Sequence, residues 1–384
     1  MNILAEPNTE PVAEHCALEP DTTHNPHATR LGKFLQATIK NGGSDLIVKS
    51  GKPPRIRLRG SLKSLDTDLV EPNEFVEIAK QILNTEQLDD LTKHGSVDFA
   101  YDYDSGNRFR VNIFQARGKL SMAARLITSN ILPFEALNLP PVMSEISMQA
   151  QGIVILAGMT GSGKSTTIAS MLDYVNERKN VHIVTIEDPI EFIYEDKKAT
   201  IHQREIGIDV LDFKIGLRAL VRENPDIVLI GEMRDAETIE AALHAAETGH
   251  LVFGTVHASS CAQTMTRIYD LFPPDEREQV RKIIGEQTRA IVYQKLLPTL
   301  KPEVSRVPAL EILINNSVVK KFILEGREGE LLDVMRTQEA RQAGMIDFNG
   351  SLVKLVEEEM VQMRVAMEAT TNPDELKMRL KKLG

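Results

Sequence analysis

The pattern of hydrophobic and polar residues changes character once along the chain. Up to about residue 130, apolar residues recur at helical spacing in some segments and alternate with polar residues in others. Beyond that point, short continuous apolar runs are separated by helical segments, which is typical of strands buried on both faces of a parallel sheet. The sequence therefore predicts a small α+β domain followed by an α/β domain.

The first domain is predicted from helical and alternating segments of ordinary length. Helical spacing and cap residues indicate helices over residues 31–39, 74–83 and 86–93. Strand-like segments are predicted at 45–49, 56–58, 97–103, 107–115 and 120–126, and the last three of them form an antiparallel meander. Together these segments make a compact α+β unit.

The domain boundaries follow from composition. Residues 1–30 are rich in Pro, Glu, Thr, Asn and His, show no apolar period and are predicted to form a flexible leader. Residues 31–130 form the α+β domain. Residues 131–141 are punctuated by prolines and are predicted to be a hinge, and residues 142–384 form the α/β domain.

The strongest motif is the glycine-rich segment GMTGSGKS at residues 158–165, which follows the apolar run 153–156 and precedes a predicted helix over 165–175. Its glycines let the backbone turn so that successive N–H groups point at phosphate oxygens, and the helix N-terminus adds its positive dipole end. Lys164 is predicted to reach the β- and γ-phosphates and Ser165 to bind Mg²⁺. A plain glycine-rich turn is the alternative, which the flanking strand and helix disfavour.

ATP and Mg²⁺ are therefore the predicted ligands. The residues predicted to hold them are Gly158, Thr160, Gly161, Ser162, Gly163, Lys164, Ser165 and Thr166, with Ser165 as the metal ligand.

Three more predicted strands, over residues 181–186, 227–230 and 251–256, end in residues with functional chemistry. They are followed by Glu187, by Gly231 and Glu232, and by His257. Because the carboxyl ends of parallel strands meet at one edge of a sheet, these residues and the phosphate loop are predicted to converge there.

Glu232 is the predicted general base for hydrolysis. In the usual nucleotide-hydrolase pattern an Asp of the Mg²⁺ shell precedes it, but Gly231 stands in that place here. Mg²⁺ is then expected to rely on Ser165, phosphate oxygens and water, with help from Glu187. The alternative is that Glu232 pairs with Arg234 or caps the helix that begins near residue 235.

Two histidines bracket the strand at 251–256. His250 precedes it and His257 follows it, so the two side chains need not point the same way. Each is predicted either to sense the γ-phosphate or to serve a structural role at a strand end.

Composition and charge limit the classes of protein that fit. A chain of 384 residues with 42% apolar residues can hold two or three domains with hydrophobic cores. Its continuous apolar stretches are too short to cross a bilayer, and acidic residues stand near the N-terminus where a secretory signal needs basic ones, so a cytoplasmic protein is expected. Two cysteines provide neither a disulfide framework nor a zinc site, and a net charge of −10 argues against a general nucleic-acid binder.

Four segments in this order and spacing, GMTGSGKST, IEDPIEF, GEMRD and TGHLVFGTVH, make the chain resemble the type II/IV secretion and type IV pilus motor ATPases, and within them the PilT/PilU retraction group. The likeness covers residues 31–384. It implies a PAS-like N-terminal domain, a RecA-like ATPase domain, and a hexameric ring in which each N-terminal domain packs on its neighbour's ATPase domain. It also implies Lys164 and Ser165 as phosphate and Mg²⁺ contacts, Glu187 as the acidic-box residue, Glu232 as the hydrolytic glutamate, and His250 and His257 as the histidine box.

The resemblance also implies arginines that reach the nucleotide across a domain or subunit boundary. In this chain Arg108, Arg110, Arg117 and Arg125 lie in the predicted meander where such residues fall. Solvated strand charges are the alternative for at least two of them. Arg218 and Arg222, before the strand at 227–230, are further candidates.

The function that the resemblance implies is a cytoplasmic motor ATPase at the pilus base, peripheral to the inner membrane, which couples ATP hydrolysis to type IV pilus retraction through an inner-membrane platform protein. One departure is the segment VVKKFILEGR at 318–327, which lacks the central arginines of the AIRNLIREGK motif of retraction motors. An auxiliary motor, or a nucleotide-binding scaffold working with a paralogous ATPase, is therefore an alternative. A pilus or type II secretion assembly ATPase is another, although the four-cysteine zinc insertion usual in those proteins is excluded.

Overall fold

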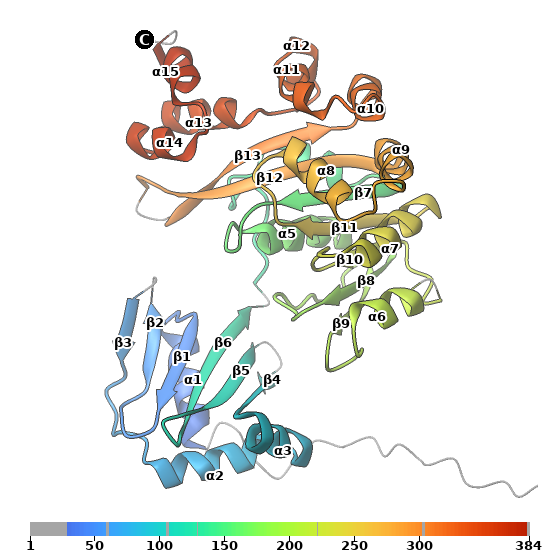
Figure 1. Ribbon diagram of the computed structural model, residues 1–384. Helices are drawn as coiled ribbons and strands as arrows, with labels where there is room; N and C mark the ends of the chain where they lie inside the picture. Colours follow the sequence, from blue (N-terminus) through green and yellow to red (C-terminus); the bar gives the residue numbers. More distant parts are fainter. Residues whose placement is uncertain are drawn as a thin grey trace, which may run out of the picture. The chain divides into compact units, whose positions relative to one another are not determined.

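The computed structural model describes residues 29–58, 61–104, 107–128, 130–220, 222–301 and 304–381. They divide into two compact units that adjoin in sequence at Leu126 and Ile127. The first unit contains a six-stranded sheet and the second a seven-stranded sheet (Figure 1). The predicted leader lies outside the described residues except for its last two, of which Arg30 already begins the first helix.

The first unit combines three helices with its sheet, as predicted. The helices are α1 (Arg30–Lys40), α2 (Pro72–Ile82) and α3 (Thr85–His94). The strands, in the spatial order β3-β2-β1-β6-β5-β4, are β1 (Asp45–Lys49), β2 (Arg55–Leu58), β3 (Ser61–Ser64), β4 (Ser96–Asp104), β5 (Asn107–Ala116) and β6 (Lys119–Thr128). Strand β3 was not predicted, because all four of its residues are exposed and it carries no alternating pattern.

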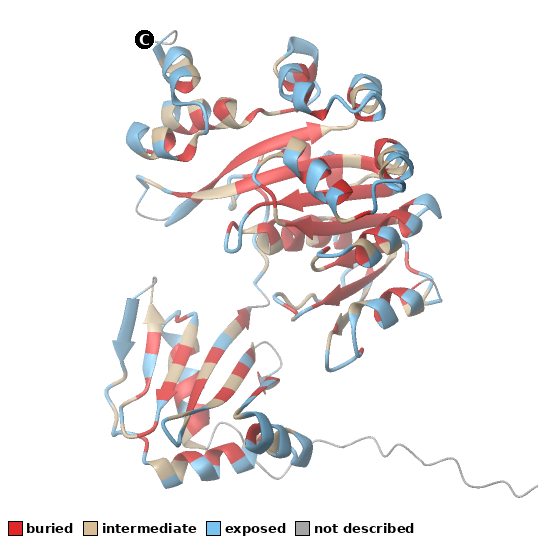
Figure 2. Cartoon of the chain, viewed as in Figure 1, coloured by how far each residue is buried: buried red, intermediate tan, exposed pale blue. Residues whose placement is uncertain are grey.

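One face of this sheet is buried, which explains the alternation in the sequence. Along β5, Phe109, Val111 and Ile113 are buried and the residues between them are not. Figure 2 shows the result as bands of buried and more exposed residues along the strands of the first unit. The buried side chains form one hydrophobic cluster with residues of the helices, such as Leu35 and Phe75.

The second unit is built around a mostly parallel sheet. In the spatial order β13-β12-β7-β11-β10-β8-β9, every neighbouring pair is parallel except β12 and β13. The strands are β7 (Gly152–Ala157), β8 (His182–Glu187), β9 (Thr200–Glu205), β10 (Ile227–Ile230), β11 (Leu251–Val256), β12 (Thr288–Pro298) and β13 (Arg306–Ile314). The predicted α/β fold class is confirmed.

Helices cover both faces of this sheet, so its central strands are buried throughout (Figures 1 and 2). Ile153 and Ile155 of β7 pack into one apolar cluster, whereas Val154 and Leu156 pack into another. The helices are α4 (Val142–Ser147), α5 (Lys164–Asn176), α6 (Phe213–Leu220), α7 (Ala236–Glu247), α8 (Cys261–Asp270), α9 (Arg277–Gln287), α10 (Ser317–Leu324), α11 (Leu331–Met335), α12 (Gln338–Gln342), α13 (Phe348–Glu357), α14 (Met363–Ala369) and α15 (Pro373–Lys381).

The proline-punctuated segment at 131–141 packs against the second unit. Phe134 and Leu139 are buried in the apolar cluster that includes α4 and α5. The ring of Phe134 lies 5.1 Å from that of Tyr174 in α5, centroid to centroid. The segment is thus part of the packing of this unit, and its role as a hinge stays a prediction.

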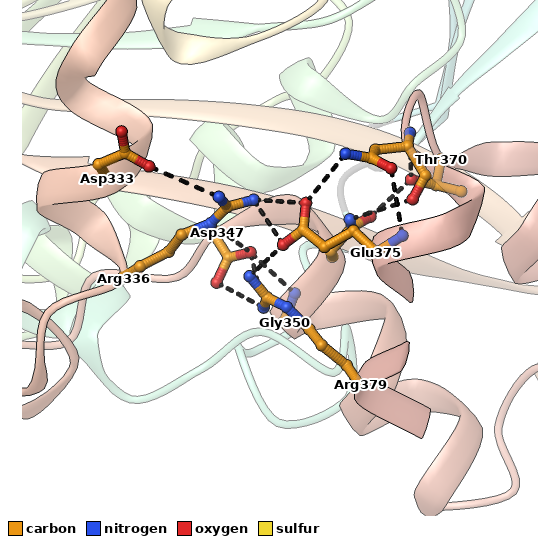
Figure 3. Close-up of polar contacts among 9 residues, drawn as sticks. Asp333, Arg336, Asp347, Gly350, Thr370, Glu375 and Arg379 are labelled. Atoms are coloured by element: carbon orange, nitrogen blue, oxygen red, sulfur yellow. Dashed lines mark hydrogen bonds and ion pairs between the residues drawn. The ribbon is translucent and has the colours of Figure 1, made fainter. Parts of the chain in front are cut away.

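A cluster of four charged side chains holds the last helix in place (Figure 3). Both carboxylate oxygens of Glu375, in α15, accept bonds of 2.6 Å from Arg336, which follows α11. Arg379, also in α15, bonds Glu375 at 2.6 Å and Asp347 at 2.9 Å. Asp347 is 4% exposed and caps the N-terminus of α13. Since a buried charge that loses its partner is strongly destabilising, these side chains tie α15 to α11 and α13 as a group.

Candidate active site

The four predicted site segments meet at one edge of the parallel sheet. The loop after β7, the end of β8 and the residues after β10 and β11 all lie at carboxyl ends of strands that are neighbours in the order β7-β11-β10-β8. This order places His257, after β11, between the phosphate loop and Glu232. The Nε2 atom of His257 lies 3.1 Å from Oε1 of Glu232.

Lys164 is held within the phosphate loop itself. Its side chain is 9% exposed, and Nζ donates to the carbonyl oxygens of Gly158 at 2.8 Å and Met159 at 3.3 Å. Burial lowers the pKa of this ammonium, while the charges of Glu232 and Glu191 act in the opposite direction. A phosphate oxygen is a stronger partner for an ammonium than a neutral carbonyl, so this lysine is placed to exchange one for the other.

The rest of the loop fits a phosphate group. The hydroxyl of Ser162 is buried without a hydrogen-bond partner in the part of the chain that the structure describes. Thr160 and Gly161 form an exposed tip, and Ser165 and Thr166 are half-buried in the first turn of α5. An unpartnered buried hydroxyl beside an exposed turn and a helix N-terminus suits an anionic ligand. Ser165 is placed where a P-loop serine would hold Mg²⁺.

Glu187, the last residue of β8, is a buried carboxyl at this edge. Its side chain accepts hydrogen bonds at Oε1 from the hydroxyl of Thr185 at 2.7 Å and from Nε2 of Gln203 at 3.2 Å. Burial raises its pKa to about 7, although these hydrogen bonds act in the opposite direction. A divalent cation nearby would favour its ionised form.

Glu232 is a second carboxyl at this edge, and its pKa is shifted in the direction opposite to that of Glu187. A hydrogen bond from Arg234, 2.6 Å from Nη2 to Oε2, is the main cause of a lowered pKa, so the group stays ionised and able to accept a proton. The pairing with Arg234 that the sequence offered as an alternative is therefore present. The helix-cap alternative is wrong, because Asp235 caps α7 by accepting a bond from the Thr238 N–H at 2.9 Å. The role of general base stays a prediction.

The structure gives a steric reason for Gly231 in the place of an Asp. A Cβ atom at this position would lie 3.2 Å from both the Cα of Glu187 and the carbonyl oxygen of Ile186. The backbone is also fixed on both sides, since Gly231 donates to Ile186 at 2.8 Å and accepts from the Thr255 hydroxyl at 2.6 Å. Strands β8 and β10 therefore approach too closely here for a larger residue without a local shift.

His250 does not join this site within one copy of the chain. It precedes β11, and its carbonyl oxygen accepts a bond from Gly152 at the start of β7, which places it at the amino edge of the sheet. Since β11 has six residues, the two histidines are separated by roughly 20 Å. Nδ1 of His250 instead lies 2.8 Å from the carbonyl oxygen of Ala245. Within one copy of the chain the two histidines therefore lie at opposite edges, and the role of each at the nucleotide stays a prediction.

Of the predicted nucleotide-binding arginines of the first unit, Arg110 and Arg117 are exposed and Arg108 is partly buried. Arg108 and Arg110 flank the buried Phe109 on β5, so they share the face opposite to the hydrophobic cluster. Arg108 lies 3.4 Å from Asp102, and Arg117 occupies the turn between β5 and β6 with a φ of 53°. Their contact with nucleotide stays a prediction.

The remaining arginine candidates are also at the surface. Arg125 donates to Asp45 at 3.0 Å within the first unit. Arg218 on α6 and Arg222 after it are exposed.

Sequence reasoning missed Gln294, which contacts the phosphate loop from β12. Its Nε2 donates to the carbonyl oxygen of Ser162 at 2.8 Å, and its Oε1 accepts from the hydroxyl of Thr167 at 2.8 Å. The side chain is 2% exposed. No motif marks this residue, and the available signal was a polar amide inside the strand-like run IVYQKLL.

A cavity of about 900 Å³ lies elsewhere in the second unit, between residues 138–141, β13 and α13, and its lining includes no residue of the phosphate loop. Within the described ranges, no helix combines the length and apolar character that a membrane span needs. The same residues contain no group of three or more His, Cys, Asp or Glu placed to hold a metal ion together.

Comparison with known proteins identifies related chains. The family model described as type II/IV secretion system protein matches residues 117–377. The type IV pilus retraction ATPase PilT of Pseudomonas aeruginosa is 38% identical over 90% of this chain and 99% of its own length. The type IV pilus ATPase PilU of the same organism is 33% identical, covering 91% of each chain. A crystal structure of the pilus retraction motor PilT with bound ADP is 39% identical, with a TM-score of 0.84 over 90% of this chain and 98% of that one.

Proposed function

This chain belongs to the type II/IV secretion system protein family, and on that premise we propose that it is a Mg²⁺-dependent ATPase that drives retraction of a type IV pilus. The observation that supports retraction best is the likeness to a pilus retraction ATPase across 99% of that protein's length. The structure supports the ATPase chemistry, since the phosphate loop, Glu232 and His257 lie at one sheet edge. The related motor crystallised with ADP supports a nucleotide at this edge.

Each residue of the site has a role in hydrolysis. Backbone N–H groups of residues 158–165 bind phosphate oxygens, and Lys164 turns from its loop carbonyls to the phosphates. Ser165 would hold Mg²⁺, which supplies charge neutralisation at the phosphates. Glu232 accepts a proton from the attacking water, and His257 fixes the position of that carboxylate. Glu187 adds acidic charge at the adjacent strand end.

The proposed assembly is a homo-hexamer in the cytoplasm at the pilus base, acting on an inner-membrane platform protein. In it, Arg108, Arg110 and Arg117 of the first unit would complete the nucleotide site from across a domain or subunit boundary. These proposals rest on the family resemblance and on the exposure of Arg110 and Arg117.

A second candidate function is an auxiliary motor, or a scaffold, that works with a paralogous ATPase. One support is the likeness to PilU. The other is α10, which contains Lys320 and Lys321 and does not contain the arginines found in the corresponding motif of retraction motors. Lys320 is bonded to Glu286 of α9 at 2.6 Å, so one of these lysines serves the packing of the unit.

Deleting the gene in its own host distinguishes these functions. Loss of a retraction motor should leave pili on the surface, in excess, while surface motility stops. Loss of an assembly motor should remove the pili, which would contradict the proposal. Complementation with the wild-type chain should restore motility and complementation with Lys164→Ala should not. Restoration by Lys164→Ala would instead establish the scaffold.

Hydrolysis and assembly are tested together on purified protein. Wild-type chain with Mg²⁺-ATP should show turnover in a species with six times the monomer mass. A monomer at micromolar concentration, both with and without ATP, would count against the ring. A hexamer that binds ATP and barely turns it over would favour the auxiliary function.

A further inference from the structure

The side-chain amide of Gln294 makes two hydrogen bonds, one with Ser162 of the phosphate loop and one with Thr167 of α5. We propose that Gln294 is a positioning residue for nucleotide binding, which aims the Gly163 N–H group at the phosphate. The inference rests on the proposed ATPase function and concerns the same site.

The argument begins with the peptide unit between Ser162 and Gly163. In a planar trans peptide the C=O and N–H groups point in opposite directions. Gln294 bonds the Ser162 carbonyl oxygen at 2.8 Å from the side of β12. The Gly163 N–H of the same unit is therefore directed away from β12, into the concave side of the loop. Rotation of this unit would turn that donor away and would leave the Gln294 amide unpaired in a buried position.

The second contact fixes the other end of the same turn. Thr167, in α5, donates its hydroxyl to the Gln294 Oε1 atom at 2.8 Å. Both partners are buried, since Thr167 and Gln294 are each 2% exposed. The Gln294 amide thus links the loop to the first turns of α5, since its Nε2 atom donates to the loop and its Oε1 atom accepts from the helix.

The fit of Gln294 depends on glycine at 163. A Cβ atom at this residue would lie 2.7 Å from Nε2 of Gln294, and the backbone there has a φ of 86°, which other residues rarely adopt. The register of β12 against β7 brings Tyr293 opposite Ala157, so Gln294 stands beside the start of the loop. The strand that carries Gln294 is hydrogen-bonded on both sides, to β7 and to β13, and is a rigid support.

The test is a titration of the full chain with a fluorescent ADP analogue in the presence of Mg²⁺. Gln294→Met keeps the length of the side chain and removes both hydrogen bonds. The expected result is a dissociation constant raised by about tenfold or more, which corresponds to the loss of one well-placed backbone donor. In hydrolysis assays the KM for ATP should rise while kcat at saturating ATP stays within about threefold, because Gln294 contacts neither Glu232 nor His257.

Asn315→Leu is the matched control. Asn315 is likewise held by two hydrogen bonds, which its Nδ2 atom donates to the backbone carbonyls of Gly285 and Thr288 at 2.9 Å each, near the opposite end of β12. This variant should lose stability without losing affinity for ADP. If Gln294→Met fails to fold, Thr167→Val removes one of the two bonds and should weaken binding two- to threefold, whereas Thr167→Ser should bind as the wild type does.

Two results would overturn the inference alone. One is a dissociation constant of a folded Gln294→Met variant within twofold of the wild-type value, and the other is an equal loss of affinity in Asn315→Leu. A wild-type chain that binds no nucleotide would overturn the proposed ATPase function together with the inference.

Discussion

The two edges of the parallel sheet in the second unit carry similar residues in different surroundings. At the carboxyl edge, Lys164 and Glu187 are buried and their pKa values are shifted by burial. At the amino edge, polar residues bond mainly to the backbone: Asp226 accepts from the His182 N–H at 2.8 Å, and His250 lies 2.8 Å from the Ala245 carbonyl oxygen.

The difference shows that residue type alone does not mark a catalytic edge. Acids and histidines follow or precede strands at both edges, but at the carboxyl edge they lie beside the phosphate loop, where the charge of Glu232 acts on Lys164. His257 contacts Glu232, whereas His250 contacts the Ala245 carbonyl oxygen and the Thr248 hydroxyl. Groups with perturbed pKa values gathered beside the phosphate loop, rather than the kind of partner that each group has, distinguish the carboxyl edge.

The largest predicted contrast comes from two lysines. Lys164→Ala should abolish ATP hydrolysis and weaken ADP binding by at least roughly a hundredfold, because no other ammonium of the loop faces the phosphates. Lys179 is the matched control, since it also donates to two backbone carbonyls, those of Met148 and Gln149, at the other end of α5. Lys179→Ala should leave turnover within twofold. Turnover is measured by phosphate release. An equal loss of turnover in both variants would contradict the proposed difference between the two edges.

The second contrast uses two carboxylates that are each paired with an arginine. Glu232→Gln should keep nucleotide binding and slow turnover by at least about a hundredfold, because a general base is removed. Glu223, which is paired with Arg204 and precedes β10, is the control. Glu223→Gln should turn over ATP as the wild type does. Unchanged turnover in Glu232→Gln would leave Glu232 with the ion-pair role only.

Substituting the histidines is expected to slow hydrolysis less than substituting Lys164 or Glu232. His257→Ala should slow hydrolysis by about tenfold, since Glu232 loses a partner at 3.1 Å. His250→Ala should change it by less than twofold in the isolated chain, because its contacts are at the other edge. A larger effect from His250→Ala in a sample shown to be hexameric would indicate that this histidine acts in a neighbouring subunit.

The last prediction concerns stability rather than turnover. Glu187 has a folded pKa of about 7, above its ordinary value of 4.5, so the folded state binds the extra proton and stability falls as pH rises from 4.5 to 7. Glu187→Gln removes this contribution. Urea unfolding without nucleotide or Mg²⁺ should show that wild type loses up to about 3 kcal/mol more than the variant over this range. Parallel pH curves for the two proteins would show that Glu187 is already ionised when folded.

Much of the fold could be predicted because its signals are local. Strands β10 and β11 have the predicted bounds, since β10 is a continuous apolar run that Gly231 follows and β11 is a mostly apolar run that His257 follows. Strands β9, β12 and β13 were missed. Strand β9 is half-exposed and polar in sequence, and β12 and β13 contain charged residues or proline whose burial depends on helices elsewhere in the chain.

The site was predictable as a set of strand ends but not as a set of contacts. Sequence shows that Glu232 and His257 follow strands, but only the sheet order makes β10 and β11 neighbours and brings the two side chains to 3.1 Å. Gln294 is 132 residues from Ser162 along the chain, and no spacing rule reaches that far. His250 was assigned with His257 because the family resemblance treats the two as one motif.

Gly231 also has a consequence for how such chains are recognised in genomes. A search profile that requires an aspartate after the third apolar strand of the nucleotide-binding unit would reject this chain. The exclusion would be an error of the profile, because a Cβ atom at this position would lie only 3.2 Å from Glu187 and Ile186 and would require a local shift. The position is better treated as one where glycine suits the close approach of strands β8 and β10.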